Sequence, residues 1–273
     1  MIDRYAVIGH PIGHSKSPHI HAAFAAATGQ DMSYVAMEAP LDGFRSTVTQ
    51  FIAEGGKGVN VTLPFKVQAF ELATDPQESA RLAGAANALK FEGDRILAEN
   101  FDGIGLVNDI QHNLGVSLQS KRVLICGAGG ATRGAILPIA AQSPASLVIA
   151  NRTSAKAAAL AKEFSDRTQL SGCGYEDLQG ESFDVILNAT STGLGQDALP
   201  LPPGVFASDA LAYELVYGKG LTSFLRQAQA AGVTAVADGV GMLVEQAAEA
   251  FAWWRGVRPD TAGVIKALTV PLV

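Results

Sequence analysis

From Lys121 onward, short apolar runs alternate with helical patterns, and this alternation restricts the possible folds more than any other feature of the chain. The runs RVLIC, SLVIA and FDVILNA have the length of buried strands, and helical patterns at 131–142 and 154–164 separate them. A further run, ALAYEL, precedes a helical pattern at 220–231, and VTAVAD follows Gly232, where a helix would end. Strands alternating with helices form βαβ units, so we predict a Rossmann-like, doubly wound parallel sheet with helices on both faces.

The residues before this region show a similar alternation. Ser17 is suited to cap a helix, Pro18 to begin it and Gly29 to end it. MSYVAMEA, a helix near 41–54 and the strand VNVTL continue the α/β pattern, and a turn at 92–95 predicts a hairpin. The tail holds an amphipathic helix, GMLVEQAAEAFAWWRG, which we expect to return to the first domain. We therefore predict two α/β domains, residues 1–102 with 239–273 and residues 103–238, with a cleft between them.

Composition and charge restrict the class of partner. The chain has 273 residues, of which 48% are hydrophobic and 17% charged, and its net charge is −6. Because its Lys and Arg residues are scattered, we expect neither a nucleic acid nor an anionic membrane surface as partner, but a small molecule. We find no signal peptide or apolar run of spanning length and expect a cytoplasmic protein, as monomer or homodimer. Cys126 and Cys173 lack the spacing of zinc ligands and are predicted to be unbridged.

A glycine-rich loop follows the first strand of the second domain. LICGAGGATRG places Gly127, Gly129 and Gly130 between a strand and a helix, the setting in which such loops bind a dinucleotide pyrophosphate. The free N–H groups at the helix N-terminus favour phosphate there. Thr132 stands where the usual fingerprint has its third glycine, so a tight turn without a ligand remains the alternative.

The end of the next strand indicates which dinucleotide is bound. NAD-binding domains usually have Asp or Glu there, whereas NRTSAK supplies Asn151, Arg152, Thr153 and Lys156. A guanidinium and an ammonium suit a 2′-phosphate, which a carboxylate would repel. We therefore predict NADP(H) as the cofactor. The alternative is that Thr153 caps a helix and the nearby cations are only exposed to solvent.

The segment GVNVTLPFK combines a strand pattern with short polar side chains. Apolar residues at 59, 61 and 63 alternate with Asn60 and Thr62, which indicates a half-buried strand that the proline at 64 stops. Asn and Thr are suited to hydrogen-bond a ligand held close to the strand, and Lys66 follows them. A lysine oriented by a carboxylate, here Asp102 of LAENFDGIGL, is suited to the proton transfer that accompanies hydride transfer to a carbonyl. A lone lysine is more often an exposed surface residue.

These motifs together resemble those of the shikimate dehydrogenase family. The resemblance covers nearly the whole chain, through GHPIGHSKSPHIHAAF, GVNVTLPFK, GAANAL, NFDGIG, GAGGATRG, NRT, LVYGKGLT and DGVGMLVEQAAEAF. It implies two α/β domains and the reversible NADPH-dependent reduction of 3-dehydroshikimate to shikimate, in the chorismate pathway of aromatic amino-acid biosynthesis.

The resemblance also assigns residues to roles. It implies that Lys66 and Asp102 are a catalytic dyad. It implies that the substrate carboxylate is bound by Ser15, Ser17 and Tyr217. It implies that the ring substituents are bound by Asn60, Thr62, Asn87 and Gln246. The cofactor-binding residues it implies are Gly127, Ala128, Gly129, Gly130, Ala131, Asn151, Arg152, Thr153, Lys156 and Gly239.

Several of these residues have simpler explanations. Ser17 is suited to cap a helix, Asn87 to close a turn, and Gln246 to be a buried amide on an apolar helix face. The chain also departs from the family at three positions: Phe101 replaces a common threonine, Glu214 a common aspartate, and Lys156 a frequent arginine. We expect positions 101 and 214 to touch none of the residues assigned to chemistry.

The histidines near the N-terminus raise the question of a metal site. His10, His14, His19 and His21 are close in sequence, but Pro and Gly break any helix between the first two, and no acidic or cysteine ligand accompanies them. We expect no bound metal.

Other functions remain open at this stage. One is a broader quinate/shikimate dehydrogenase that prefers NAD, which the basic NRTSAK segment disfavours. Another is a non-catalytic regulatory protein that binds shikimate-like ligands, which should have lost Lys66 or Asp102. A methylenetetrahydrofolate dehydrogenase is disfavoured because that family lacks the paired serines of HSKSP.

Overall fold

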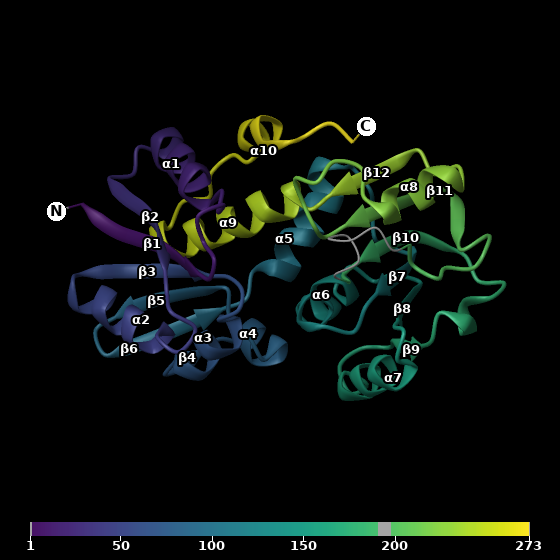
Figure 1. The fold of residues 1–273 in the computed structure, drawn as a ribbon, viewed down its shortest axis with the longest axis horizontal. Helices are drawn as coiled ribbons and strands as arrows, with labels where there is room; N and C mark the ends of the chain where they lie inside the picture. The colour runs from purple at the N-terminus through teal and green to yellow at the C-terminus, as the bar shows by residue number, and fades with distance from the viewer. Residues whose placement is uncertain (1, 191–197, 273) are drawn as a thin grey trace. The chain divides into compact units, whose positions relative to one another are not determined.

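The computed structural model describes residues 2–190 and 198–272 (Figure 1). The chain divides into two compact units: Met1–Gly105 with Val244–Lys266, and Leu106–Leu243 with Ala267–Val273. Helix α9 (Val240–Arg255) contributes its first residues to the second unit and the remainder to the first. The domain limits that we predicted, and the cleft between the domains, remain predictions. Within the described residues, no helix is long and apolar enough to cross a bilayer.

The first unit contains a mixed sheet with strand order β2-β1-β3-β5-β6-β4. Its strands are β1 (Asp3–Gly9), β2 (Met32–Glu38), β3 (Gly56–Val61), β4 (Asp75–Pro76), β5 (Ala88–Glu92) and β6 (Arg95–Glu99). β1 is parallel to β2 and β3, whereas β5 is antiparallel to β3 and β6. The predicted hairpin is confirmed, because Glu92 of β5 pairs with Arg95 of β6. The helices of this unit, besides its part of α9, are α1 (Ser17–Thr28), α2 (Phe44–Ala53), α3 (Lys66–Leu72), α4 (Glu78–Ala83) and most of α10 (Ala262–Leu268).

The two faces of this sheet differ in chemistry because side chains alternate along each strand. On one face, Val59 and Val61 of β3 belong to an apolar cluster that includes Phe44, Phe51 and Phe65. Each such fully buried side chain contributes about 1.5–3 kcal/mol by leaving water. Asn60, between the two valines, lies on the opposite face. There the aromatic residues of β1, β2, α1 and α9 pack together: Tyr5, Tyr34, His21 and Trp254.

The second unit contains a parallel sheet with strand order β12-β11-β10-β7-β8-β9. Its strands are β7 (Arg122–Cys126), β8 (Ser146–Ala150), β9 (Ser171–Cys173), β10 (Phe183–Asn188), β11 (Phe206–Glu214) and β12 (Ala235–Asp238). Its helices include the last turn of α5 (Asp102–Asn108), which begins in the first unit, with the π-helical turn Asp109–Asn113, and α6 (Gly130–Ala140), α7 (Ser154–Glu163) and α8 (Ser223–Ala230). This order of parallel strands is that of a doubly wound nucleotide-binding sheet.

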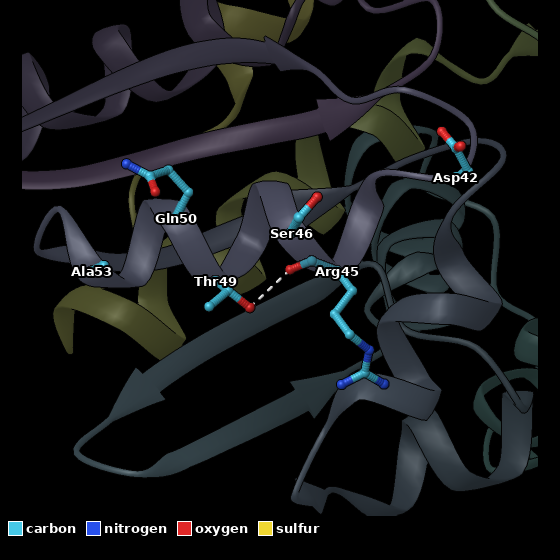
Figure 2. A pocket seen from close by; sticks show the side chains of 6 residues that line it. All are labelled: Asp42, Arg45, Ser46, Thr49, Gln50 and Ala53. Atoms are coloured by element: carbon cyan, nitrogen blue, oxygen red, sulfur yellow. Dashed lines mark hydrogen bonds between the residues drawn. The ribbon is translucent and has the colours of Figure 1, made fainter.

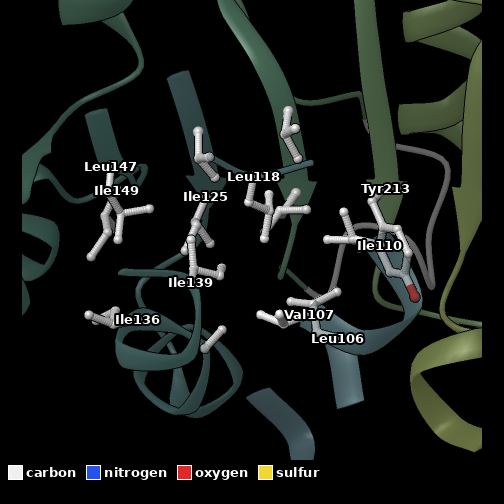
Figure 3. Packing of buried hydrophobic residues seen from close by; sticks show 14 of the residues in the cluster. Leu106, Val107, Ile110, Leu118, Ile125, Ile136, Ile139, Leu147, Ile149 and Tyr213 are labelled. Carbon is white, nitrogen blue, oxygen red and sulfur yellow. The ribbon is translucent and has the colours of Figure 1, made fainter. Parts of the chain in front are cut away.

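Helices cover both faces of the second sheet. Figure 3 shows Ile125 and Ile149 of the central strands packed against residues of α5 and α6, such as Leu106 and Ile136. Leu124, which alternates with Ile125, belongs instead to a second cluster that contains residues of α8. Neighbouring positions of one strand thus face different helices, and the predicted doubly wound sheet is confirmed.

The structure corrects the predicted end of the strand in GVNVTLPFK. β3 ends at Val61, and Leu63, which the alternation places inside, is 73% exposed. The chain turns here: the Phe65 N–H donates to the Thr62 carbonyl oxygen, at 3.0 Å, and Phe65 occupies the buried position instead. Lys66 follows this turn as the first residue of α3.

The start of α1 also differs from prediction. Lys16 occupies the N-cap position and makes no side-chain capping bond, while Ser17 is the first helical residue. The side chain of Ser17 is consequently not used as a cap. Gly29 ends the helix as predicted, in a left-handed conformation with φ of 64°.

Candidate active site and nucleotide loop

A lysine and a carboxylate form an ion pair at the starts of two helices of the first unit. The Lys66 Nζ atom donates to Asp102 Oδ2 at 2.6 Å, and the two side chains are 27% and 17% exposed. Lys66 is held there because buried Phe65 anchors the first turn of α3. Asp102 begins α5 directly after the hairpin. The predicted dyad is therefore in direct contact, and both side chains remain partly accessible to a ligand.

Asn87 connects this pair to the rest of the polar cluster. Its Oδ1 atom accepts from the Phe101 N–H at 2.9 Å. Its Nδ2 atom donates both to Asp102 Oδ1 at 2.8 Å and to Gln246 Oε1 at 3.0 Å. The side chain is buried, with 2% exposure, so these bonds fix its orientation. Asn87 therefore holds one oxygen of the Asp102 carboxylate while Lys66 holds the other, in addition to any contact that Asn87 makes with a ligand.

Asn60 lies one strand away and is joined to Asn87 through the backbone. Its Nδ2 atom donates to the Asn87 carbonyl oxygen at 3.2 Å. Its Oδ1 atom lies 2.7 Å from the Tyr34 hydroxyl oxygen and 3.1 Å from His21 Nε2. The polar face of β3 thus meets protein groups as well as any ligand. His21 and Tyr34, which were not predicted to belong to the site, are in direct contact with Asn60.

The serine pair and Thr62 complete the set in the first unit. The Ser17 N–H donates to Ser15 Oγ at 3.3 Å, and Ser17 is 7% exposed. Burial raises the pKa of Tyr34, and a hydrogen bond with the Ser17 side chain has a smaller, opposing effect on that pKa. Thr62 is half-buried, with its N–H bonded to the Ile8 carbonyl oxygen. The first unit therefore supplies hydroxyls, amides, one ammonium and one carboxylate, a set that is suited to a polyhydroxylated ligand. Side-chain hydrogen bonds join Lys66, Asp102, Asn87 and Gln246 directly.

Two departures from the family pattern lie beside this cluster or near the nucleotide loop. Phe101 contacts Asn87, a residue predicted to bind substrate, through its backbone N–H. Its ring packs edge-on against Trp253, with the centroids 5.8 Å apart. Glu214 is fully buried in the second unit and bonds Asn188 and Thr222, and burial raises its pKa.

The glycine loop of the second unit has the geometry of a nucleotide site. Gly127 has φ of 108°, and a Cβ atom there would lie 3.0 Å from Thr190 Cγ2. In contrast, a Cβ atom at Gly129 or Gly130 would meet nothing within 4 Å, so these exposed positions leave room for a ligand. Gly130 begins α6, whose first N–H groups have no carbonyl partner within the helix and favour an anion. The residues present therefore fit a pyrophosphate.

Thr132, which stands where the usual fingerprint has its third glycine, bonds back to the glycine loop. Its side chain is fully buried, and its Oγ1 atom donates to the Gly127 carbonyl oxygen at 2.7 Å. The hydroxyl thereby ties the first turn of α6 to the strand end. The loop is closed by a side-chain bond at this position.

The basic segment after β8 is exposed and available. Thr153 is the N-cap residue of α7 but makes no side-chain capping bond, and Asn151 Nδ2 donates to the Thr153 carbonyl oxygen at 3.0 Å. Arg152 and Lys156 are exposed, and neither has an acidic partner among the residues that the structure describes. Their charges are suited to a phosphate group.

Two predicted residues have other surroundings. Tyr217 lies in the second unit after β11 and is 39% exposed; its substrate role remains a prediction. A Cβ atom at Gly239 would lie 2.2 Å from the Leu215 carbonyl oxygen, so close backbone packing alone requires glycine there. Among the described residues, no group of three His, Cys, Asp or Glu side chains is placed to hold a metal.

A separate shallow pocket lies on the outer surface of α2 (Figure 2). None of the residues discussed above lines it. Its lining consists of Asp42, Arg45, Ser46, Thr49, Gln50 and Ala53. The Thr49 hydroxyl donates to the Arg45 carbonyl oxygen of the same helix at 2.9 Å, so its polar groups are partly used within the helix.

Models of known families match most of the chain. Residues 7–89 match the shikimate dehydrogenase substrate binding domain. Residues 109–194 match shikimate / quinate 5-dehydrogenase, and residues 239–269 match the shikimate 5′-dehydrogenase C-terminal domain. These ranges include Lys66 of the ion pair and the glycine loop at 127–131.

Individual relatives are similar over the whole length. A shikimate dehydrogenase (NADP(+)) from Dechloromonas aromatica is 55% identical over 273 residues, 100% of both chains. The crystal structure of an Ael1 enzyme from Pseudomonas putida superimposes with a TM-score of 0.95 and 60% identity, over 99% of this chain and 100% of that one. Shikimate 5-dehydrogenase from Thermus thermophilus, in complex with NADP(H) and shikimate, gives a TM-score of 0.86 and 33% identity, over 98% of each chain. The similarity therefore extends over both units.

Proposed function

The chain belongs to the shikimate dehydrogenase family, and we propose that it catalyses the reversible reduction of 3-dehydroshikimate to shikimate with NADPH. The observation that carries the proposal is the Lys66–Asp102 ion pair, held by Asn87 within a group of short hydrogen-bonding side chains. We also infer a cytoplasmic enzyme of the chorismate pathway, without a nucleic-acid partner, that works as a monomer or homodimer. The unbridged state of Cys126 and Cys173 is compatible with a reducing compartment.

NADP(H) is the cofactor. The loop at 127–131 would hold its pyrophosphate at the N-terminus of α6, and Arg152, with Lys156, would pair with the 2′-phosphate. When bound, the cofactor supplies the hydride that reduces the C3 carbonyl carbon. The alternative of an NAD-preferring enzyme has less support, because no carboxylate stands where the ribose 2′-hydroxyl would be bound.

Lys66 would handle the proton. In the reduction, the C3 oxygen takes a proton from the Lys66 ammonium as the carbonyl becomes an alcohol, and the neutral amine then regains a proton from solvent. In the oxidation, the amine takes the alcohol proton. Asp102 holds the ammonium in place and is itself fixed by Asn87, so little reorganisation is needed as charge develops on the oxygen.

The other side chains of the first unit would bind the rest of the substrate. The hydroxyls of Ser15 and Ser17, with Tyr217, would bind the carboxylate. The amides of Asn60, Asn87 and Gln246 and the Thr62 hydroxyl would bind ring hydroxyls. A site of this kind rejects analogues that leave its polar groups unpaired, by several kcal/mol in total.

A spectrophotometric assay tests the proposal. Shikimate or quinate is offered with NADP or NAD, and reduced nicotinamide is followed by its near-ultraviolet absorbance. We expect turnover to be fastest with shikimate and NADP. Turnover that is faster with quinate and NAD would favour the broader dehydrogenase, and binding of shikimate without turnover would favour a regulatory protein.

A further inference from the structure

The orientation of the Asn60 amide can be deduced from a neighbour that is chemically unambiguous. One end of this amide lies 3.2 Å from the Asn87 carbonyl oxygen. A carbonyl oxygen only accepts hydrogen bonds, so the amide atom facing it must be the nitrogen. It follows that the amide oxygen, Oδ1, faces His21 and Tyr34.

This orientation fixes the tautomer of His21. Because Oδ1 only accepts, the Nε2 atom at 3.1 Å must carry the hydrogen. His21 is fully buried, and burial lowers its pKa to about 3, so the ring is neutral and Nδ1 has no hydrogen. Nδ1 is buried and has no hydrogen-bond partner among the described residues. The other tautomer would leave Nδ1–H unpaired and set two lone pairs against each other, which is costlier still.

Tyr34 occupies the other acceptor position of the same oxygen. Its hydroxyl donates to Oδ1 at 2.7 Å, and its ring stacks on that of His21 with centroids 4.1 Å apart and planes at 8°. The two lone pairs of Oδ1 are therefore both used by protein donors. Turning the amide over would break both bonds and oppose two acceptors at Asn87.

We propose that His21 and Tyr34 are positioning residues that hold the Asn60 amide with its nitrogen, and not its oxygen, available to the substrate. The proposal rests on the proposed function for the identity of the substrate. One hydrogen of Nδ2 goes to Asn87, and the second has no partner among the described residues. Asn60 therefore acts as a donor, and the substrate atom that it binds is an oxygen that accepts.

Catalytic measurements in a double-mutant cycle test this role. Tyr34→Phe removes the hydroxyl donor and keeps the ring stack. We expect it to raise the KM for shikimate about fivefold, the effect of one neutral hydrogen bond, with kcat nearly unchanged. In an Asn60→Ala background, the same substitution should change KM less than about 1.5-fold, because Tyr34 acts through Asn60.

The matched control is Tyr5→Phe, which removes the hydroxyl of another buried tyrosine of the same unit, one that lies 3.5 Å from Arg255 Nη1. The KM of Tyr5→Phe for shikimate should equal that of the wild type. Equal effects of Tyr34→Phe in the two backgrounds would overturn the proposal, since a general structural role does not depend on Asn60.

The histidine is tested without any variant. In a nitrogen-15 NMR spectrum of the intact protein at neutral pH, His21 should show the Nε2–H tautomer. The Nδ1–H tautomer, or a doubly protonated ring, would refute the assignment. This measurement needs no substrate, so its failure is distinct from failure of the proposed function, which would appear as a wild-type protein that does not oxidise shikimate.

Discussion

At the level of single residues, the proposed chemistry depends on one amine, that of Lys66. Lys66→Ala removes the group that we assign to proton transfer and leaves the amides and hydroxyls in place. We expect kcat to fall on the order of 10² or more, with a smaller change in the KM for shikimate. Steady-state kinetics with NADP at saturation measures both parameters.

The matched control for this prediction is Lys57→Ala. Lys57 is an exposed lysine of β3, the strand that precedes Lys66. The Lys57→Ala substitution should leave kcat unchanged. Wild-type turnover in Lys66→Ala would exclude this amine as the proton-transfer group.

A second residue-scale prediction concerns the cofactor. Arg152→Ala should raise the KM for NADP about tenfold, the lower range for a charge-assisted bond because the side chain is exposed, and should hardly affect NAD. The control is Arg226→Ala, which replaces an exposed arginine of α8 and should leave the KM for NADP unchanged. Parallel losses with both cofactors would contradict the assignment to the 2′-phosphate.

The sequence points to the residues that we propose for the chemistry more readily than to those that we propose to orient them. Lys66 and Asp102 belong to distinctive motifs, and the structure places them in contact. His21 and Tyr34 lie on a helix face and a strand that look like ordinary core, and the sequence suggests for His21 only the question of a metal ligand. Their role depends on which end of the Asn60 amide they meet, and this is a property of packing between separate elements.

At the level of elements, we expect different glycines of the loop to matter for folding and for cofactor binding. Gly127→Ala places a Cβ atom against Thr190 in a left-handed conformation, so we expect a loss of about 1–3 kcal/mol in the free energy of unfolding. Gly129→Ala meets no protein atom and should leave the unfolding free energy nearly unchanged while weakening NADPH binding. Urea unfolding and a fluorescence titration with NADPH distinguish the two variants.

The prediction for this loop would be wrong if the effects were reversed. A destabilised Gly129→Ala would mean that folding already requires the open space beside α6. Unchanged NADPH affinity in that variant would mean that the cofactor does not approach the loop there.

Most elements are predictable from their strong periodicity. The residue at which a strand ends in a local turn is not. The alternation after Lys121 and the hairpin turn at 92–95 both correspond to observed elements. The end of β3 was predicted two residues too late, because Leu63 continues the apolar alternation. The chain instead turns after Val61, and the larger Phe65 ring fills the core beside Phe44, with ring centroids 5.0 Å apart.

For the whole molecule, buried His21 makes stability depend on pH. Burial lowers its pKa from 6.5 to about 3, so between these values the unfolded chain binds a proton that the folded chain does not. Its contribution is complete above pH 6.5 and is lost as the pH falls toward 3. Between pH 7.5 and 5.5, this amounts to about 1.4 kcal/mol of unfolding free energy.

This pH dependence is measured by urea unfolding of the wild type and of His21→Phe, which keeps an aromatic ring but does not titrate. The difference between the two proteins removes the contributions of Glu99 and Glu214, whose pKa values burial raises. His19→Phe, at an exposed position of the same helix, should retain the wild-type dependence. An equal pH dependence in His21→Phe and the wild type would show that His21 is not the source.

The three-way bonding of the Asn87 side chain has an evolutionary consequence. Its oxygen accepts one bond and its nitrogen donates two, so aspartate, leucine and serine would each lose at least one of them. Consider a library with all substitutions at each site position, selected in cells whose growth requires the proposed activity. Position 87 should tolerate fewer substitutions than the other site positions, and new substrate preferences should arise through changes at its neighbours.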